Sequence, residues 1–332
     1  MVSRYEEYLP HREDEHGRYV SGQSLAGESG FLEIPVVEHW ELELRSKIME
    51  RFPGDEMPLH GYRFVQTVDI DAAWCYLHKG LFRTVVGSVR DLVGRRDFAE
   101  AARRLRVLLH READPFDTFD YILEARERLA PGSGLIFFVL LADYDQYDKP
   151  NSYLNPHLRQ LVQHLGDYAK TGIHPGYYSL EHPQQADVEI KRLADITHRD
   201  IKRARYHFLR LGMPTSYRTL LHAGILSDYT MGYADTVGFR AGISSPYPFY
   251  DLERDNETSL LIHPFCVMDT TLQKYLGLSP EEGLERYRRL IDAVRSVNGT
   301  FCCIVHNQNL GELYGWQGWR ATYEQMLEYA RP

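Results

Sequence analysis

The feature that most constrains the fold is an alternation of short apolar runs with amphipathic helical patterns from Tyr62 onward. The longest apolar run, Leu135 to Ala142, has the length of a fully buried strand. Helical periodicity follows over 156–170, 184–196 and 215–223, and each pattern leads to another short β-rich run. This alternation predicts a parallel sheet in an α/β domain, and the length of the segment suits a (β/α) barrel of about 250 residues.

The first 60 residues differ from the rest of the chain. They contain polar stretches rich in Gly and Ser and a single long helical pattern over 37–52, after which Pro53 and Pro58 interrupt the chain. We therefore divide the sequence into an N-terminal extension over 1–60, which resembles the end of a separate domain, and an α/β domain over 61–332. Further helices of this second part are predicted over 81–93, 97–110 and 118–129. Another begins at a capping box formed by Ser279 and Glu282, with Pro280 at its first position, and ends at Gly299.

Composition excludes some classes of function. The chain has 47 acidic and 38 basic residues and a formal net charge of −9, which argues against a nucleic-acid-binding protein. Its longest apolar run is far shorter than the roughly 18 residues of a transmembrane helix. The N-terminus has no secretory signal pattern, and the four cysteines lack metal-type spacing. We expect a cytoplasmic protein with reduced thiols.

Two carboxylates stand where the first predicted strand of the α/β domain ends. Asp69 and Asp71 are two positions apart, so the alternation of side chains along a strand points them to the same side. Carboxylates placed so close together repel each other unless a cation or a proton lies between them. One of the two can then bind a metal while the other acts as a base. The alternative is a helix cap followed by a loop acid.

Four histidines also stand at or just after the ends of β-rich runs: His174, His207, His263 and His306. Because the carboxyl ends of parallel strands meet at one edge of a sheet, we expect these imidazoles to gather near the Asp pair. The set is typical of a metal site with one histidine left for proton transfer. A single histidine in such a position is more commonly a structural hydrogen-bonding residue, and packing explains His263 equally well.

The order of these motifs resembles that of the polysaccharide deacetylases (carbohydrate esterase family four), whose fold is a distorted (β/α) barrel. The resemblance covers about residues 62 to 328 and is nearest to a divergent bacterial branch with an N-terminal extension. The segment Thr67-Val68-Asp69-Ile70-Asp71 is similar to the opening motif of that family. The resemblance implies that Asp69 is the general base and that Asp71 is a metal ligand.

Three further residues match motifs of the family. His174 resembles the first histidine of its His-Ser-x-x-His motif, which implies a second metal ligand. Arg205 resembles the arginine that orients the base, and His306 resembles the histidine of the Leu-x-His motif, which is the general acid. The family places its third ligand four residues after His174, where this chain has Tyr178. Our hypothesis is that His207 supplies the missing imidazole; the alternative is a degenerate metal site.

The resemblance implies a hydrolase that uses a divalent metal, expected to be Zn²⁺, to remove an N-acetyl group from a sugar or glycan. The candidates for contact with this carbohydrate substrate are Tyr178, Asp228, Arg240, His263 and Trp316. A salt bridge is the alternative role of Arg240, and core packing is the alternative for Trp316. Two other functions stay open: a metal-free or divergent amidohydrolase acting on a small amide, and a catalytically decayed carbohydrate-binding protein.

Overall fold

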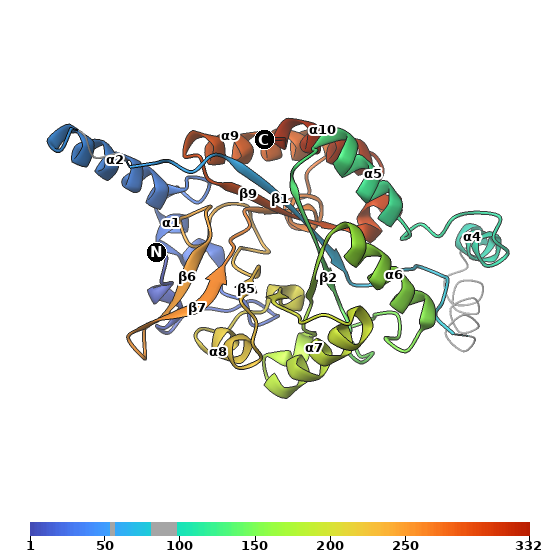
Figure 1. The fold of residues 1–332 in the computed structure, drawn as a ribbon. Coiled ribbons are helices and arrows are strands. Elements are labelled where there is room, and N and C mark those ends of the chain that lie inside the picture. Colours follow the sequence, from blue (N-terminus) through green and yellow to red (C-terminus); the bar gives the residue numbers. More distant parts are fainter. Residues whose placement is uncertain (54–56, 81–97) are drawn as a thin grey trace.

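The fold is a mixed α/β arrangement built around a single nine-stranded sheet (Figure 1). The structure is a computed structural model that describes residues 1–53, 57–80 and 98–332. The strands pair in the order β6-β7-β5-β4-β3-β2-β1-β9-β8, and every pair is parallel except β6 with β7. Their bounds are β1 (Arg63–Ile70), β2 (Gly134–Val139), β3 (Lys170–Ile173), β4 (Arg203–Ala204), β5 (Ser227–Asp228), β6 (Tyr247–Asp251), β7 (Asn256–Ile262), β8 (Val267–Met268) and β9 (Thr300–His306).

Helices follow most of the parallel strands and pack on the outside of the sheet (Figure 1). Helix α9 begins with the capping box that Ser279 and Glu282 predict, with Pro280 at its first position. The helices described are α1 (Leu25–Glu28), α2 (Val36–Arg51), α4 (Phe98–Leu108), α5 (Phe119–Leu129), α6 (Pro156–Tyr168), α7 (Pro183–Thr197), α8 (Thr215–His222), α9 (Pro280–Ser296) and α10 (Trp319–Ala330). None of them is both long and apolar enough to cross a bilayer.

The two ends of the sheet, β6 and β8, do not pair with each other in the part of the chain that is described, so the ladder of strands is not closed. One continuous segment nevertheless spans its two sides. Strand β7 pairs with β5. Four residues separate β7 from β8, and β8 pairs with β9 near the other end of the sheet. Between them, the His263 N–H donates to the Asp228 carbonyl and the Cys266 N–H donates to the Cys302 carbonyl.

Apolar side chains cover both faces of the sheet, as expected for parallel strands. The larger core lies between the sheet and its helices and includes Phe137, Phe301 and Val305. A second, smaller core takes the alternate side chains of the same strands, including Phe138 and Ile304. Packing on both faces of the sheet therefore fixes the positions of the residues at the ends of the strands.

Residues 1–53 pack against the α/β part of the chain through buried ion pairs. Glu7 binds the guanidinium group of Arg240 through both carboxylate oxygens, at 2.9 and 2.6 Å, and binds Arg4 at 2.6 Å. All three side chains are buried. Glu38, in α2, accepts hydrogen bonds from the backbone N–H and hydroxyl groups of Ser244 and Ser245. The far end of α2 projects away from the body of the molecule (Figure 1).

Most of the predicted elements agree with the structure to within a few residues, including the helices over 97–110, 118–129, 156–170 and 184–196. The predicted helix over 81–93 lies outside the described residues. The antiparallel strand β6 and the π-helix over Thr271–Tyr275 were not predicted. The expected α/β fold with a mainly parallel sheet is present, but the expected barrel is not confirmed, because the strand ladder of the described residues stays open. The proposed boundary at residue 60 stays a prediction.

We expect Glu7→Ala to lower the free energy of unfolding by about 3–5 kcal/mol, because it leaves two buried guanidinium groups without their shared carboxylate. Denaturant unfolding measures this change. The matched control is Glu28→Ala, since Glu28 is exposed and its loss should cost less than about 0.5 kcal/mol. Equal stabilities of the two variants would contradict the anchoring role of Glu7.

Candidate active site

A buried ion pair lies at the carboxyl end of β1. Asp69 is the penultimate residue of this strand and stands beside His306 of the neighbouring strand β9. The Arg205 guanidinium group donates to the Asp69 carboxylate at 2.7 Å, to the Thr67 hydroxyl at 2.7 Å and to the Tyr229 carbonyl at 2.9 Å. Arg205 is fully buried, and its guanidinium carbon lies 4.5 Å from the centre of the Phe138 ring. These contacts hold Asp69 in one orientation.

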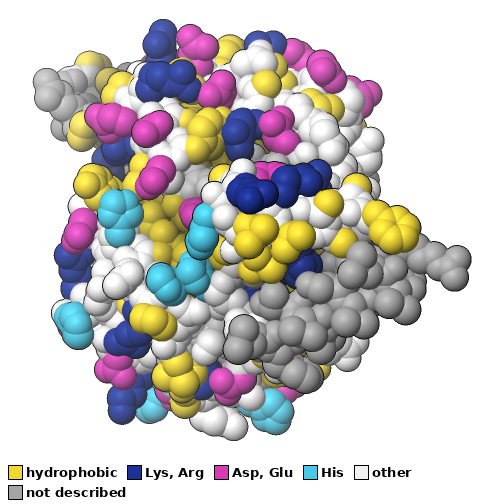
Figure 2. Space-filling view, turned by 90° about the vertical axis from the view of Figure 1, so that its right-hand side faces the viewer, with side chains coloured by type: hydrophobic (Ala, Val, Ile, Leu, Met, Phe, Trp, Pro, Cys, Tyr) yellow, Lys and Arg dark blue, Asp and Glu magenta, His cyan; other side chains and the backbone are white. Residues whose placement is uncertain are grey.

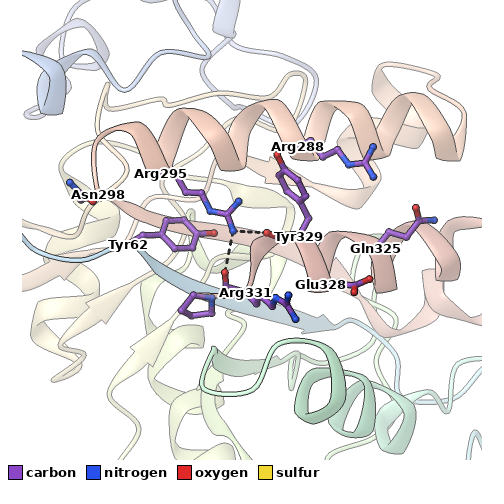
Figure 3. A pocket seen from close by; sticks show the side chains of 9 residues that line it. Tyr62, Arg288, Arg295, Asn298, Gln325, Glu328, Tyr329 and Arg331 are labelled. Atoms are coloured by element: carbon purple, nitrogen blue, oxygen red, sulfur yellow. Dashed lines mark hydrogen bonds between the residues drawn. The ribbon is translucent and has the colours of Figure 1, made fainter.

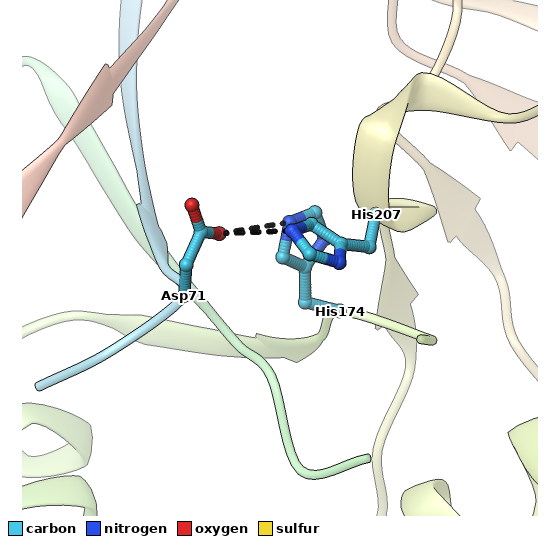
Figure 4. Close-up of side chains that lie close together, drawn as sticks. All are labelled: Asp71, His174 and His207. Atoms are coloured by element: carbon cyan, nitrogen blue, oxygen red, sulfur yellow. Dashed lines mark ion pairs between the residues drawn. The ribbon is translucent and has the colours of Figure 1, made fainter. Parts of the chain in front are cut away.

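Asp71, His174 and His207 converge on one point next to this pair (Figure 4). The Nε2 atoms of His174 and His207 each lie 3.6 Å from Oδ1 of Asp71. One ligand atom from each residue lies within 4.8 Å of the other two. His174 directly follows β3, and His207 begins the short 3₁₀ turn His207–Leu209 that follows β4.

The hydrogen bonds of the two histidines determine which ring nitrogen faces Asp71. Nδ1–H of His174 donates to the Arg205 carbonyl at 2.5 Å, and Nδ1–H of His207 donates to the Asp148 carboxylate at 2.5 Å. In the neutral form of each ring, the lone pair of Nε2 then points to Asp71, as metal binding requires. Oδ1 of Asp71 is itself buried with no hydrogen-bond partner among the described residues. Two imidazoles and a carboxylate with this orphaned oxygen fit a divalent metal ion.

The electrostatics of Asp71 agree with this arrangement. Burial alone would raise the pKa of its carboxyl group, but the interactions with His174, His207 and His306 lower the pKa well below its usual range. Asp71 is therefore ionised at neutral pH, as a metal ligand must be.

His306 lies across the same space from the two other histidines. Its Nδ1 donates to Asp269 at 2.7 Å, and its Nε2 lies 3.9 Å from Oδ2 of Asp71. Asp269 also accepts from the His306 backbone N–H and from the Asn309 side chain. Burial lowers the pKa of His306, but Asp269, Asp71 and Asp69 outweigh it and raise the pKa to about 9. The imidazole therefore carries a proton at neutral pH and is able to donate it.

These residues line one cavity of about 400 Å³, a volume typical of small-molecule sites. Figure 2 shows one face of the molecule, on which several histidine side chains reach the surface, whereas His174, His207 and His306 are buried. Apolar groups from Phe208, Leu209 and Met268 form part of the cavity wall. Glu15 and Arg18, from the N-terminal extension, line it as well. The larger cavity of about 740 Å³ between α9 and α10 lies apart from these residues and is lined by groups such as Tyr62, Arg295 and Tyr329 (Figure 3).

The five residues predicted to bind substrate all lie outside the lining of this cavity. Arg240 is buried in the ion pair with Glu7, which is the alternative role considered for it. Asp228 is fully buried and accepts two hydrogen bonds from Thr230, and burial raises the pKa of Asp228 to about 6. Tyr178 packs beside the rings of Tyr147 and Tyr177.

The other two lie elsewhere. His263 stacks on Tyr229, with ring centres 4.3 Å apart, and lines a separate cavity at the amino ends of β1, β2 and β3. Burial, together with the charges of Arg203 and Lys170, lowers the pKa of His263 to about 4. Trp316 is buried against Trp319 in the core beneath α10, the packing alternative considered for it.

Sequence reasoning missed the two carboxylates that orient the histidines. Asp269 directly follows β8, so an acid at the end of an apolar run was a usable signal. Asp148 lies in the loop between β2 and α6, nine residues after the strand, and the sequence carries no comparable signal for it. Neither Glu15 nor Arg18 stands in a motif that marks it as part of the cavity.

Comparisons with known proteins give a family match for only one part of the chain. Residues 1–53 match the model of a family of unknown function, DUF7033. A search of curated proteins gave no match. Similar solved structures include polysaccharide deacetylases and GH57-type enzymes.

A protein from Mycobacterium smegmatis, assigned as a polysaccharide deacetylase, is 14% identical, with a TM-score of 0.50, over 82% of this chain and 84% of that chain. The polysaccharide deacetylase of Bacillus cereus is 11% identical over 80% of this chain and 85% of that one, with a TM-score of 0.36. The GH57-type branching enzyme of Pyrococcus horikoshii is 11% identical over 81% and 67%, with a TM-score of 0.45. The chain thus shares its fold with the first of these structures, and the similarity to the other two is too weak to support an argument.

We expect His207→Ala to weaken Zn²⁺ binding by more than about 100-fold, because it removes one of three ligands. Titration of the metal-free protein, with metal content measured after dialysis, tests this. His263→Ala is the matched control, since that histidine lines a different cavity. Unchanged zinc stoichiometry and affinity in His207→Ala would contradict the assignment of His207 as a ligand.

Asp148→Asn should weaken Zn²⁺ binding by roughly 10- to 100-fold, because Asp148 orients the His207 ring without contacting Asp71. The same titration measures the effect. Asp143→Asn is a suitable control, since Asp143 lies in the same loop as Asp148, is exposed and pairs with Arg192 of α7. An affinity equal to that of the unsubstituted protein would show that the carboxylate does not orient the ring.

Proposed function

We propose that this protein is a metal-dependent hydrolase that removes an N-acetyl group from a sugar or glycan. The observation that carries the proposal is that three groups of residues lie at one cavity. They are the pair Asp69 and Arg205, the pair His306 and Asp269, and the cluster of Asp71, His174 and His207. Metal-dependent amide hydrolysis uses a base, an acid and a metal site, and here candidates for all three lie around one small cavity.

Asp71, His174 and His207 would hold the metal, and Zn²⁺ suits two imidazoles and one carboxylate with coordination positions left open. Such an ion, when bound, supplies a Lewis acid that polarises the amide carbonyl and lowers the pKa of water to about 7. The Asp148 and Arg205 acceptors hold Nδ1–H of the two rings, so that in the neutral rings Nε2 is the nitrogen left to bind a metal.

Asp69 is the base in this proposal. Its carboxylate lies beside the cluster, with Oδ2 at 3.7 Å from Nε2 of His174, and can take the proton of the attacking water. The guanidinium group of Arg205 holds the other oxygen, so the carboxylate cannot rotate away from the reacting atoms.

His306 is the acid. The proton on Nε2 faces the cavity, and Nδ1–H is held by Asp269, so the ring can donate to the departing amine nitrogen as the carbon–nitrogen bond breaks. The raised pKa supports this role, because the acid must be protonated at the start of the reaction. Asp269 then stabilises the orientation of the ring without itself contacting the amide.

We infer that the strands form the distorted barrel expected for a deacetylase. The segment Asn256–Met268 runs from β5 to β9, and its irregular middle part accounts for the break in the ladder. The second core, which contains Phe138, Phe265 and Ile304, would fill the inside of such a barrel.

We expect His306→Ala to lower kcat for release of acetate by about 10²- to 10⁴-fold, the usual contribution of a general acid, while zinc stays bound. An acetate assay on N-acetylglucosamine oligomers, run with metal analysis of the same samples, measures both properties. His222→Ala, an exposed histidine at the end of α8, is the control. A His306→Ala protein with near-normal turnover would exclude His306 as the acid, and loss of zinc would place it among the ligands.

A further inference from the structure

Tyr275 is an aromatic side chain exposed inside the candidate active site. It is 44% exposed, although most large apolar side chains of the α/β part are buried. It ends the π-helix Thr271–Tyr275 and lines the same cavity as Asp71 and His306. π-Helices are rare and occur frequently at functional sites, because the inserted residue redirects side chains at their ends.

The N-terminal extension holds this ring in place. Nη2–H of Arg18 donates to the Tyr275 hydroxyl at 3.0 Å, and the guanidinium carbon lies 5.6 Å from the centre of the ring. Arg18 is buried, bound through Nε to Asp14 at 2.7 Å and through Nη1 to the Phe208 carbonyl at 3.2 Å. A side chain on the surface of a π-helix is thus fixed by a residue 257 positions away in the sequence.

The polar groups near the ring suit a neutral, hydroxyl-rich ligand. The cavity lining carries charges of both signs, with Glu15, Asp69 and Asp71 on one side of the balance and Arg18 and Lys274 on the other, so no strong field of one sign selects an anion or a cation. Sugar hydroxyl groups can donate to the carboxylate and accept from the ammonium group. A pyranose ring also has a face of C–H groups, which loses contact with water when it packs on an aromatic face.

We propose that Tyr275 is the stacking platform for a pyranose ring of the substrate, and that Arg18 of the N-terminal extension is the residue that positions it. The proposal rests on the proposed function for the identity of the ligand as a carbohydrate. It gives residues 1–53 a part in substrate recognition: Arg18 acts through the tyrosine, whereas the groups that carry out hydrolysis all come from the α/β part of the chain.

The test is calorimetric binding of N-acetylglucosamine and its trimer to the zinc-loaded His306→Ala protein, in which slow turnover leaves the ligand intact. In this background we expect Tyr275→Ala to lower the affinity for the trimer by about tenfold or more. Tyr275→Phe, which keeps the ring, should lower it by less than about threefold. Tyr168→Ala, which removes a tyrosine exposed on α6, is the matched control and should bind as the parent protein does.

Arg18→Met should weaken binding several-fold, whereas Arg12→Met, an exposed arginine of the same extension, should not. Because Arg18 acts through Tyr275, adding Arg18→Met to Tyr275→Ala should cause no further loss, and this non-additivity separates positioning from a general loss of structure. Additive losses would overturn the positioning role.

No saturable binding of either sugar by the parent protein, or equal affinity of Tyr275→Ala and its parent, would overturn the platform. Failure of the proposed function has a different signature. Binding that depends on Tyr275, without any release of acetate by the wild-type protein, would contradict the hydrolysis and leave the stacking site established.

Discussion

The candidate site depends first on the buried side chain of Arg205. An arginine cannot lose its charge inside a protein, so its burial is favoured where its donors find acceptors. Nε and Nη1 of Arg205 do so, whereas Nη2 has no hydrogen-bond partner among the described residues. Here the acceptors come from two strands that are far apart in the sheet: Asp69 and Thr67 of β1, and the Tyr229 carbonyl that follows β5. The carbonyl of Arg205 also receives Nδ1–H of His174. One residue thus fixes the proposed base with its side chain and a proposed metal ligand with its backbone.

Sequence reasoning identified the groups at strand ends, because the geometry of a parallel sheet brings those positions together. Asp69, Asp71, His174, His207 and His306 all lie around one cavity. Sequence reasoning could not identify groups whose positions depend on long loops or on contacts between residues distant in the sequence. Asp148 reaches His207 from a loop, and the partner of Arg240 is 233 residues away. His263 also follows the end of a strand, but it lines the separate cavity at the amino ends of β1, β2 and β3, because the chain continues past it into β8.

The proposed role of His207 as the third ligand shows how a ligand set could be rebuilt within one fold. A ligand four residues after His174 would have to come from the 3₁₀ turn Tyr177–Ser179, where Tyr178 instead joins an aromatic cluster. His207 reaches the same centre from the next strand of the sheet. The turn that carries it contains two non-glycine residues with positive φ, Phe208 at 56° and Leu209 at 57°. Such conformations cost free energy and persist where surrounding contacts enforce them, and Arg18 provides one such contact through the Phe208 carbonyl.

The burial of Glu7 between two arginines has a consequence for how this protein can be divided, in evolution or in the laboratory. A gene fragment encoding only the α/β part would still encode Arg240, whose guanidinium group would then face a cavity left by the missing extension. Recombination that exchanges residues 1–53 for an unrelated sequence would meet the same electrostatic obstacle. The extension and the α/β part are therefore expected to be inherited together. A chain shortened to the α/β part needs an apolar residue at position 240 to fold stably without the extension.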